Sequence, residues 1–156
     1  MKSFSDELNK ILAEVYHSIL LTEETKKKYS NGNLSFRDRN TVTFLRNSQE
    51  GKKICDIADF LKISRPSATL IVQKLEKIGL VEKKINPMNE RSVIVTLTHK
   101  GRLFSAFQHR YRERLAQQVC EGFSQEEKMA LYNGLTKLNA FFIDSIKESE
   151  AIHNKK

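Results

Sequence analysis

Six side chains between residues 65 and 74 combine cations, hydroxyls, an amide and one apolar group, and the apolar stripe of their segment would turn them outward. They are Arg65, Ser67, Thr69, Leu70, Gln73 and Lys74. Cations bind phosphates, hydroxyl and amide groups hydrogen-bond to base edges, and an apolar side chain can contact the methyl group of thymine. These groups suit the major groove of double-stranded DNA, which is wide enough to admit an α-helix.

The residues around these side chains predict a helix-turn-helix. Apolar residues recur at the spacing of one helix face in two segments, first at Ile54, Ile57, Ala58 and Leu61 and then at Ala68, Ile71, Val72 and Leu75. Only residues 62–64 separate the two segments, which is too short for anything except a tight turn. Ser64 is a candidate N-cap of the second helix, whose first turn tolerates Pro66.

A β-hairpin is predicted directly after the second helix. In residues 81–85, Val81, Lys83 and Ile85 alternate with Glu82 and Lys84, and residues 91–97 are rich in β-branched side chains. Turn-forming residues 86–90 lie between the two runs. A helix-turn-helix followed by a basic hairpin is a winged helix.

This part of the sequence resembles the MarR family of bacterial transcriptional regulators. The resemblance is carried by Ile57-Ala58, Leu61 and the segments 64–69, 75–81, 86–91 and 95–101. The family pattern at the tip of the wing is Asp-x-Arg, followed by Leu-Thr-x-x-Gly. Here the first motif is Asn89-Glu90-Arg91, so the arginine is kept and the acid is its amide. Asn89 can still accept a hydrogen bond, but without charge assistance.

The resemblance implies roles for individual residues. Gln73 would pair with adenine, and Arg65 would read guanine or hold a phosphate. Arg91 would enter the minor groove, where narrow A·T stretches concentrate negative potential. Leu70 stands where family members often carry a polar or basic residue. The predicted DNA-binding residues are Ser64, Arg65, Pro66, Ser67, Thr69, Leu70, Gln73, Lys74, Lys83, Lys84, Asn89 and Arg91.

The family also commonly binds a small-molecule effector between its dimerisation helices and the winged lobe. Tyr16, Phe36 and Tyr111 are the candidate lining residues here. Packing in the protein core is the alternative role for each of them.

The rest of the chain predicts long helices on both sides of the winged helix. Helical periodicity covers residues 5–28, about 36–47, a segment after Thr98, and about 125–148, with a break at residues 30–33 and a frayed tail from Ala151. Ser35, Thr98 and the Ser124–Glu127 pair are helix-capping signals. The predicted fold is mainly α with a small β-hairpin wing.

The long helices are apolar on more than one side, which favours a homodimer. Paired across a two-fold axis, they would bury those faces in an isologous interface. Two recognition helices about 34 Å apart would then meet successive major grooves of a palindromic operator. We expect residues 1–34 and 103–156 to form the dimerisation region and residues 35–102 the DNA-binding domain.

Charge also favours a nucleic-acid partner. The chain has a formal net charge of +8, and residues 62–102 hold nine Lys and Arg against three Asp and Glu. A localised cationic surface favours a polyanion. A solvated basic surface without a partner is the alternative explanation of charge alone.

Other classes of protein find little support in the sequence. His17, His99, His109 and His153 are scattered, and no cysteine lies near them at metal-ligand spacing. No catalytic constellation and no apolar run of about 20 residues is present, so we expect no enzyme, no cofactor and no membrane span. Two cysteines, Cys55 and Cys120, fit a cytoplasmic protein with reduced thiols. A winged helix that binds protein instead of DNA is the alternative function.

Overall fold

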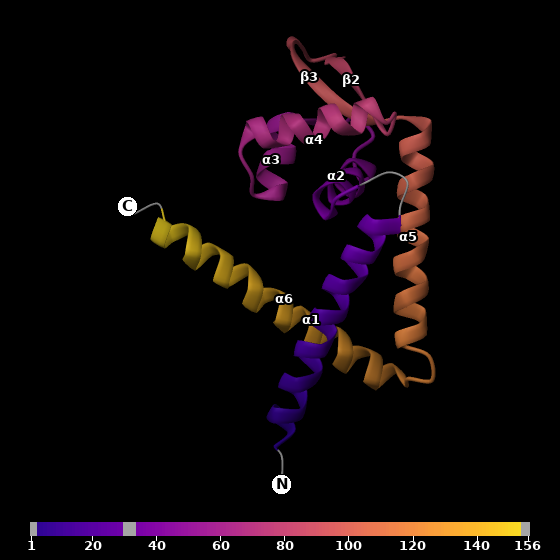
Figure 1. The fold of residues 1–156 in the computed structure, drawn as a ribbon, viewed down its shortest axis with the longest axis vertical. Coiled ribbons are helices and arrows are strands. Elements are labelled where there is room, and N and C mark those ends of the chain that lie inside the picture. The colour runs from indigo at the N-terminus through magenta and orange to yellow at the C-terminus, as the bar shows by residue number, and fades with distance from the viewer. Residues whose placement is uncertain (1–2, 30–33, 154–156) are drawn as a thin grey trace. The chain divides into compact units, whose positions relative to one another are not determined.

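The computed structural model of the chain describes residues 3–29 and 34–153 (Figure 1). In chain order the elements are α1 (Phe4–Tyr29), α2 (Phe36–Arg46), β1 (Lys52–Lys53), α3 (Ile54–Leu61), α4 (Arg65–Lys77), β2 (Val81–Asn86), β3 (Asn89–Leu97), α5 (His99–Val119) and α6 (Gln125–His153). The predicted fold class, mainly α with a β-hairpin wing, is confirmed. The break predicted at residues 30–33 lies outside the described residues.

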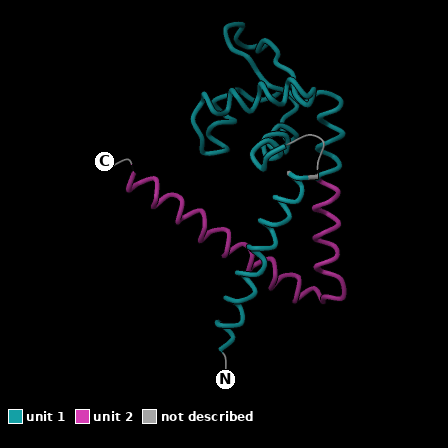
Figure 2. The backbone as a smooth tube through the Cα atoms, viewed as in Figure 1, with its two compact units in different colours: residues 1–108 teal, residues 109–156 magenta. Residues whose placement is uncertain are grey.

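The chain divides into two compact units, Met1–Gln108 and His109–Lys156 (Figure 2). The first unit holds α1 to β3 and the beginning of α5, and the second holds the rest of α5 and α6. The predicted division into a dimerisation region and a DNA-binding domain concerns an assembly, so it stays a prediction.

The core of the first unit lies between α2, α3, α4 and the sheet. The apolar stripes predicted for α3 and α4 face each other there, because helices with one apolar face bury it against one another. The buried apolar residues are Leu34, Val42, Leu45, Ile57, Ala58, Ala68, Val72, Leu75, Leu80, Val81, Val95 and Leu97. This core fixes how α4 is presented to solvent.

Side chains form hydrogen bonds with backbone N–H groups at the starts of α2 and α6, as the sequence predicts. The Ser35 Oγ accepts a hydrogen bond from the Asp38 N–H at 3.1 Å, and the Asp38 carboxylate accepts from the Ser35 N–H at 2.7 Å. Ser124 and Glu127 form the same reciprocal pair at α6. These bonds use N–H groups that have no partner within a helix.

The sheet has three antiparallel strands in the order β1-β3-β2. In β1, Lys52 pairs with Val95 and Lys53 with Ile94. This third strand is absent from the sequence prediction, which contains only the hairpin. The predicted turn of residues 86–90 is too long, because Asn89 and Glu90 already belong to β3.

The start of α5 packs tightly against the turn between α4 and β2. Thr98 Oγ1 donates to the Gly79 carbonyl at 2.6 Å and accepts from the Gly101 N–H at 3.0 Å. A Cβ at Gly101 would lie 1.9 Å from the Leu80 carbonyl oxygen. The close approach of the two backbones therefore requires glycine at this position.

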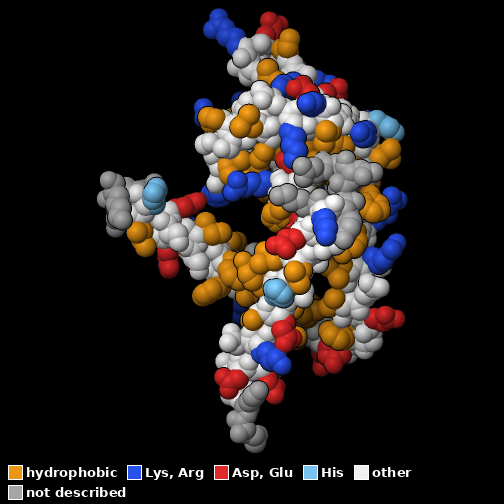
Figure 3. Space-filling model, viewed as in Figure 1, with side chains coloured by type: hydrophobic (Ala, Val, Ile, Leu, Met, Phe, Trp, Pro, Cys, Tyr) orange, Lys and Arg blue, Asp and Glu red, His pale blue; other side chains and the backbone are white. Residues whose placement is uncertain are grey.

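The long helices expose many apolar side chains (Figure 3). None of the residues of α6 that the structure describes is buried. This helix runs to His153, five residues beyond the predicted end, so the frayed tail predicted from Ala151 is wrong for residues 151–153. Within the described ranges, no helix is long and apolar enough to cross a membrane.

Candidate nucleic-acid interface

The outer face of α4 presents a guanidinium, a leucine and an amide to solvent. Arg65, Leu70 and Gln73 are exposed, with Leu70 at 67%, whereas Ala68 and Val72 on the opposite stripe are buried. Among the described residues Arg65 has no ion-pair partner. The helix therefore offers groups for a phosphate or guanine, a thymine methyl and an adenine within one exposed surface.

Hydroxyl groups at the start of α4 are engaged in local hydrogen bonds. The Ser64 Oγ caps the helix by accepting from the Ser67 N–H at 3.3 Å, and the two hydroxyls lie 2.9 Å apart. The Thr69 hydroxyl donates to the Arg65 carbonyl at 3.0 Å. Pro66 occupies the first turn, where its missing N–H costs nothing. These contacts order the first turn of α4, and each hydroxyl keeps acceptor capacity for a nucleic acid.

Lys74, one of the predicted DNA-binding residues, is paired with a buried acid of another helix. Its ammonium donates to the Asp38 carboxylate at 2.6 Å, and Asp38 is 2% exposed. This contact could not be predicted from the sequence, because 36 residues separate the partners. A Ser35-x-x-Asp38 spacing signals a helix cap, but no local pattern signals a cation from another helix.

The two lysines of β2 are also paired with acids. Lys83 donates to Glu76 of α4 at 2.7 Å, and Lys84 lies 2.8 Å from the Glu82 carboxylate. The hydrogen bond from Lys84 lowers the pKa of Glu82 below its ordinary value, and the charges of Lys84 and Arg102 add to the effect. Contact of Lys83 or Lys84 with a DNA backbone would therefore compete with bonds inside the chain.

The tip of the wing carries Arg91 in an exposed position. The Asn89 Oδ1 accepts a hydrogen bond from the backbone N–H of Arg91 at 3.0 Å, and the Ser92 hydroxyl donates to the Asn89 carbonyl at 3.0 Å. No acid in the described part of the chain pairs with the Arg91 guanidinium. The wing thus holds its backbone with local bonds and leaves this cation available.

The chain is similar in sequence to known transcriptional regulators. Residues 44–93, which run from α2 into β3, match the sequence pattern of the MarR family. The chain is 32% identical over 108 residues to YfiV of Bacillus subtilis (strain 168), described as an uncharacterized HTH-type transcriptional regulator. That match covers 69% of this chain and 67% of the relative. The chain belongs to the MarR family. The resemblance found in the sequence motifs is thereby confirmed.

Solved structures of other proteins share the fold of this MarR-family chain. Streptococcus pneumoniae FabT, crystallised in complex with DNA, has a TM-score of 0.77 at 23% identity, covering 90% of this chain and 98% of that one. MepR, a transcription regulator of the Staphylococcus aureus multidrug efflux pump MepA, has a TM-score of 0.65 at 18% identity, covering 90% and 99%. At these identities the likeness establishes the winged-helix fold alone.

The candidate effector residues of this MarR-family chain lie in both units. Tyr16 and Phe36 belong to the first unit and are 65% and 59% exposed, and Tyr111 in the second is 51% exposed. Phe36 lines a hollow of about 420 Å³ that Tyr16 does not line. A role in effector binding stays a prediction for all three residues, and none is packed in the core of its own chain.

The remaining reactive groups form no recognisable centre. Cys55 and Cys120 are free thiols, each partly buried. Among the described residues, no group of three His, Cys, Asp or Glu is arranged to hold a metal ion.

Proposed function

We propose that this chain is a sequence-specific DNA-binding regulator that acts as a homodimer on a palindromic operator. The observation that carries the proposal is that α4 exposes Arg65, Leu70 and Gln73 while the wing exposes Arg91. No acid among the described residues pairs with the Arg91 guanidinium. A helix for the major groove and a cation for the minor groove are the two contacts by which a winged helix can read a duplex. Family membership supports this reading over binding to protein alone.

The homodimer is supported by apolar side chains that the single chain leaves uncovered. On α6, Leu135, Phe142 and Ile146 share one stripe and are 55%, 55% and 48% exposed. On α1, Ile11 and Val15 are about half exposed. Burial of such stripes against a second copy is favourable, and a two-fold axis lets the same surface serve both subunits.

We further propose that the regulator is a repressor of the cytoplasm whose occupancy of the operator blocks polymerase. FabT was crystallised with DNA, and MepR was crystallised with DNA and, separately, with ethidium bromide. By analogy, a small-molecule effector would bind this chain and alter the spacing of its recognition helices. The identity of the effector is left to a ligand screen.

Binding to DNA is the first experiment. The purified protein is titrated against the duplex upstream of its own coding sequence and against a scrambled duplex, across a series of salt concentrations. We expect one dimer per site and a preference of about a thousandfold or more for the native duplex. Equal and steeply salt-dependent binding to both duplexes would mean that only phosphates are read. Selection from random sequences would then separate an operator elsewhere from a lack of specificity.

A further inference from the structure

Two adjacent residues in the first turn of α2 connect that helix to two others. Asp38 accepts a hydrogen bond from Lys74 of α4, with 2.6 Å between Oδ2 and Nζ. Arg39 pairs with Glu23 of α1 and donates through Nη1 to the Leu34 carbonyl at 2.7 Å. Charged contacts therefore run from α1 through α2 to the helix proposed to read DNA.

Asp38 is suited to fix the position of a partner. The same carboxylate oxygen that binds Lys74 accepts from the Ser35 N–H at 2.7 Å, and the residue is 2% exposed. An acceptor held by a helix cap and by burial has little freedom to move. Removing its cation would leave an uncompensated charge in the protein, which is costly. Asp38 of α2 therefore fixes the position of the Lys74 ammonium.

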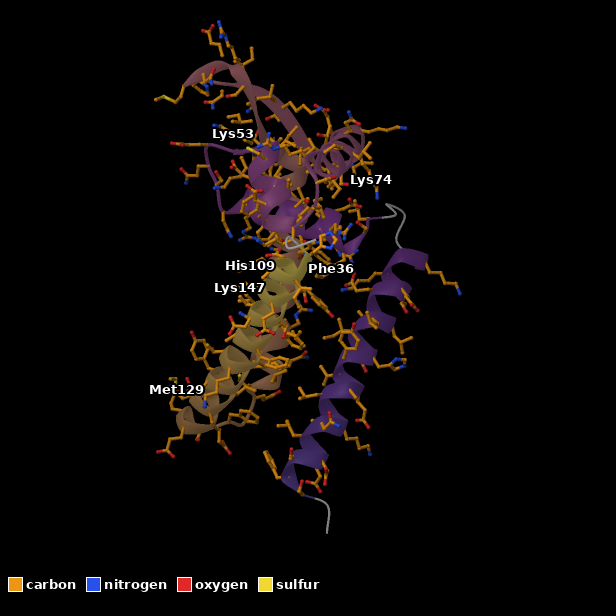
Figure 4. All side chains as sticks on the ribbon, turned by 90° about the vertical axis from the view of Figure 1, so that its left-hand side faces the viewer. Phe36, Lys53, Lys74, His109, Met129 and Lys147 are labelled. Atoms are coloured by element: carbon orange, nitrogen blue, oxygen red, sulfur yellow. The ribbon has the colours of Figure 1, made fainter. Side chains whose placement is uncertain are left out.

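The second pair shares a surface with the first. Glu23, Arg39 and Lys74 line the same hollow as Phe36, and Figure 4 labels Phe36 and Lys74 on α2 and α4. Burial lowers the pKa of Arg39, yet its guanidinium stays charged at any neutral pH. The Arg39 cation is therefore present under the conditions in which the protein would bind DNA.

We propose that Lys74 is a positioning residue of α4 and not a phosphate contact, and that Asp38 and Arg39 fix the orientation of α4 relative to α1. The inference rests on the proposed function and changes one of its assigned residues. The bond to Asp38 holds the lysine within the protein, and what the operator meets is the α4 surface that this bond orients. A shift of α1 would reach α4 through the same residues.

The two roles of Lys74 predict opposite effects of Asp38→Asn. If Lys74 contacts a phosphate, loss of the acid releases the cation, so the affinity for DNA stays equal or rises. If Lys74 positions α4, the variant weakens specific binding by about tenfold, the cost of one charge-assisted hydrogen bond. Lys74→Met also distinguishes the two roles. Loss of a phosphate contact reduces the salt slope, which is the slope of the logarithm of the binding constant against the logarithm of the salt concentration, by about 1. Loss of positioning leaves this slope unchanged.

The test measures binding of the full chain to its selected operator and to a scrambled duplex at several salt concentrations. The variants are Asp38→Asn, Lys74→Met, the double variant, and Lys77→Met as a control that removes an exposed cation from the same helix. We expect both single variants to lose about tenfold in specific affinity at an unchanged slope, with the double variant no worse than either. Glu23→Gln should weaken specific binding in the same direction, and Lys77→Met should not.

Folding is checked by thermal denaturation of each variant. Should Asp38→Asn unfold, the salt slope of Lys74→Met decides alone, because that side chain is 41% exposed and its truncation leaves the core intact. An operator-specific wild type whose Lys74→Met variant shows a slope reduced by about 1 would overturn the inference while the proposed function stands. A wild type that fails to distinguish the two duplexes would overturn the function and the inference together.

Discussion

Arg91 and Asn89 show how one amide organises the tip of the wing. In the family pattern an acid stands at this position and helps to hold the arginine in place, whereas this chain has Asn89. In the structure Asn89 instead accepts from the backbone N–H of Arg91, at 3.0 Å. The side chain of Arg91 is exposed, and no acid among the described residues pairs with it. Replacement of the acid by its amide thus removes a competing anion from the only cation at the tip that the structure describes.

Arg91→Ala tests whether the wing contributes to DNA binding. We expect affinity for the operator to fall at least about tenfold, because a cation in a narrow minor groove is lost. Fluorescence anisotropy with labelled operator measures the change, and light scattering checks that the dimer is intact. Lys147→Ala, which removes an exposed cation of α6, is the matched control and should bind normally. Unchanged affinity of the Arg91 variant would remove the wing from the interface.

A second prediction concerns Gln73→Ala on the exposed face of α4. If Gln73 pairs with an adenine, the variant should lose discrimination of about 1–3 kcal/mol at one base pair and keep its preference elsewhere. Binding to a set of operators with single base substitutions measures this loss position by position. A uniform loss over all positions would show that Gln73 contributes no base contact.

Several helix bounds and caps could be predicted because the segment concerned carries a local signal. The bounds of α3 follow from its apolar stripe, and Ser64 and Thr98 cap their helices as predicted. The strand β1 had no such signal, since its two lysines show no apolar alternation and become a strand only by pairing with β3. The bond from Lys74 to Asp38 joins residues far apart in the chain. The sequence therefore predicted Lys74 only as a DNA contact.

Gly101 lies where α5 approaches the turn between α4 and β2 closely. Gly101→Ala should destabilise the chain by about 1–3 kcal/mol, because the new Cβ would overlap the Leu80 carbonyl oxygen and force the backbones apart. Urea unfolding monitored by circular dichroism measures the change. His99→Ala, at an exposed position of the same turn, should stay within about 0.5 kcal/mol of the unmodified chain. Equal stability of both variants would mean that α5 can move away without cost.

For the whole molecule, the decisive property is the amount of apolar surface that one chain leaves in water. The residues of α6 include no buried position among those described, although Leu135, Phe142 and Ile146 share a stripe. A single chain therefore gains little from folding this helix, and association with a second copy supplies the missing burial. Stability should consequently depend on protein concentration.

Leu135→Glu tests the association. The charge lies within the exposed apolar stripe of α6, so we expect the variant to be monomeric at micromolar concentration and to lose specific DNA binding. Sedimentation or light scattering gives the oligomeric state. Asn133→Glu introduces the same charge on the opposite side of the helix and should remain dimeric. A dimeric Leu135 variant would exclude this stripe from the interface.

The strand order β1-β3-β2 has a consequence for solubility. It leaves β2 at an edge of the sheet, where a row of unpaired backbone N–H and C=O groups can recruit a strand from another molecule. Lys83 and Lys84 lie in the middle of that edge, and Pro87 follows it directly. Lysine and proline are the residues by which natural proteins discourage such recruitment. The two lysines that the sequence predicts as DNA contacts would thus also keep neighbouring wings from adding to one another into an aggregate.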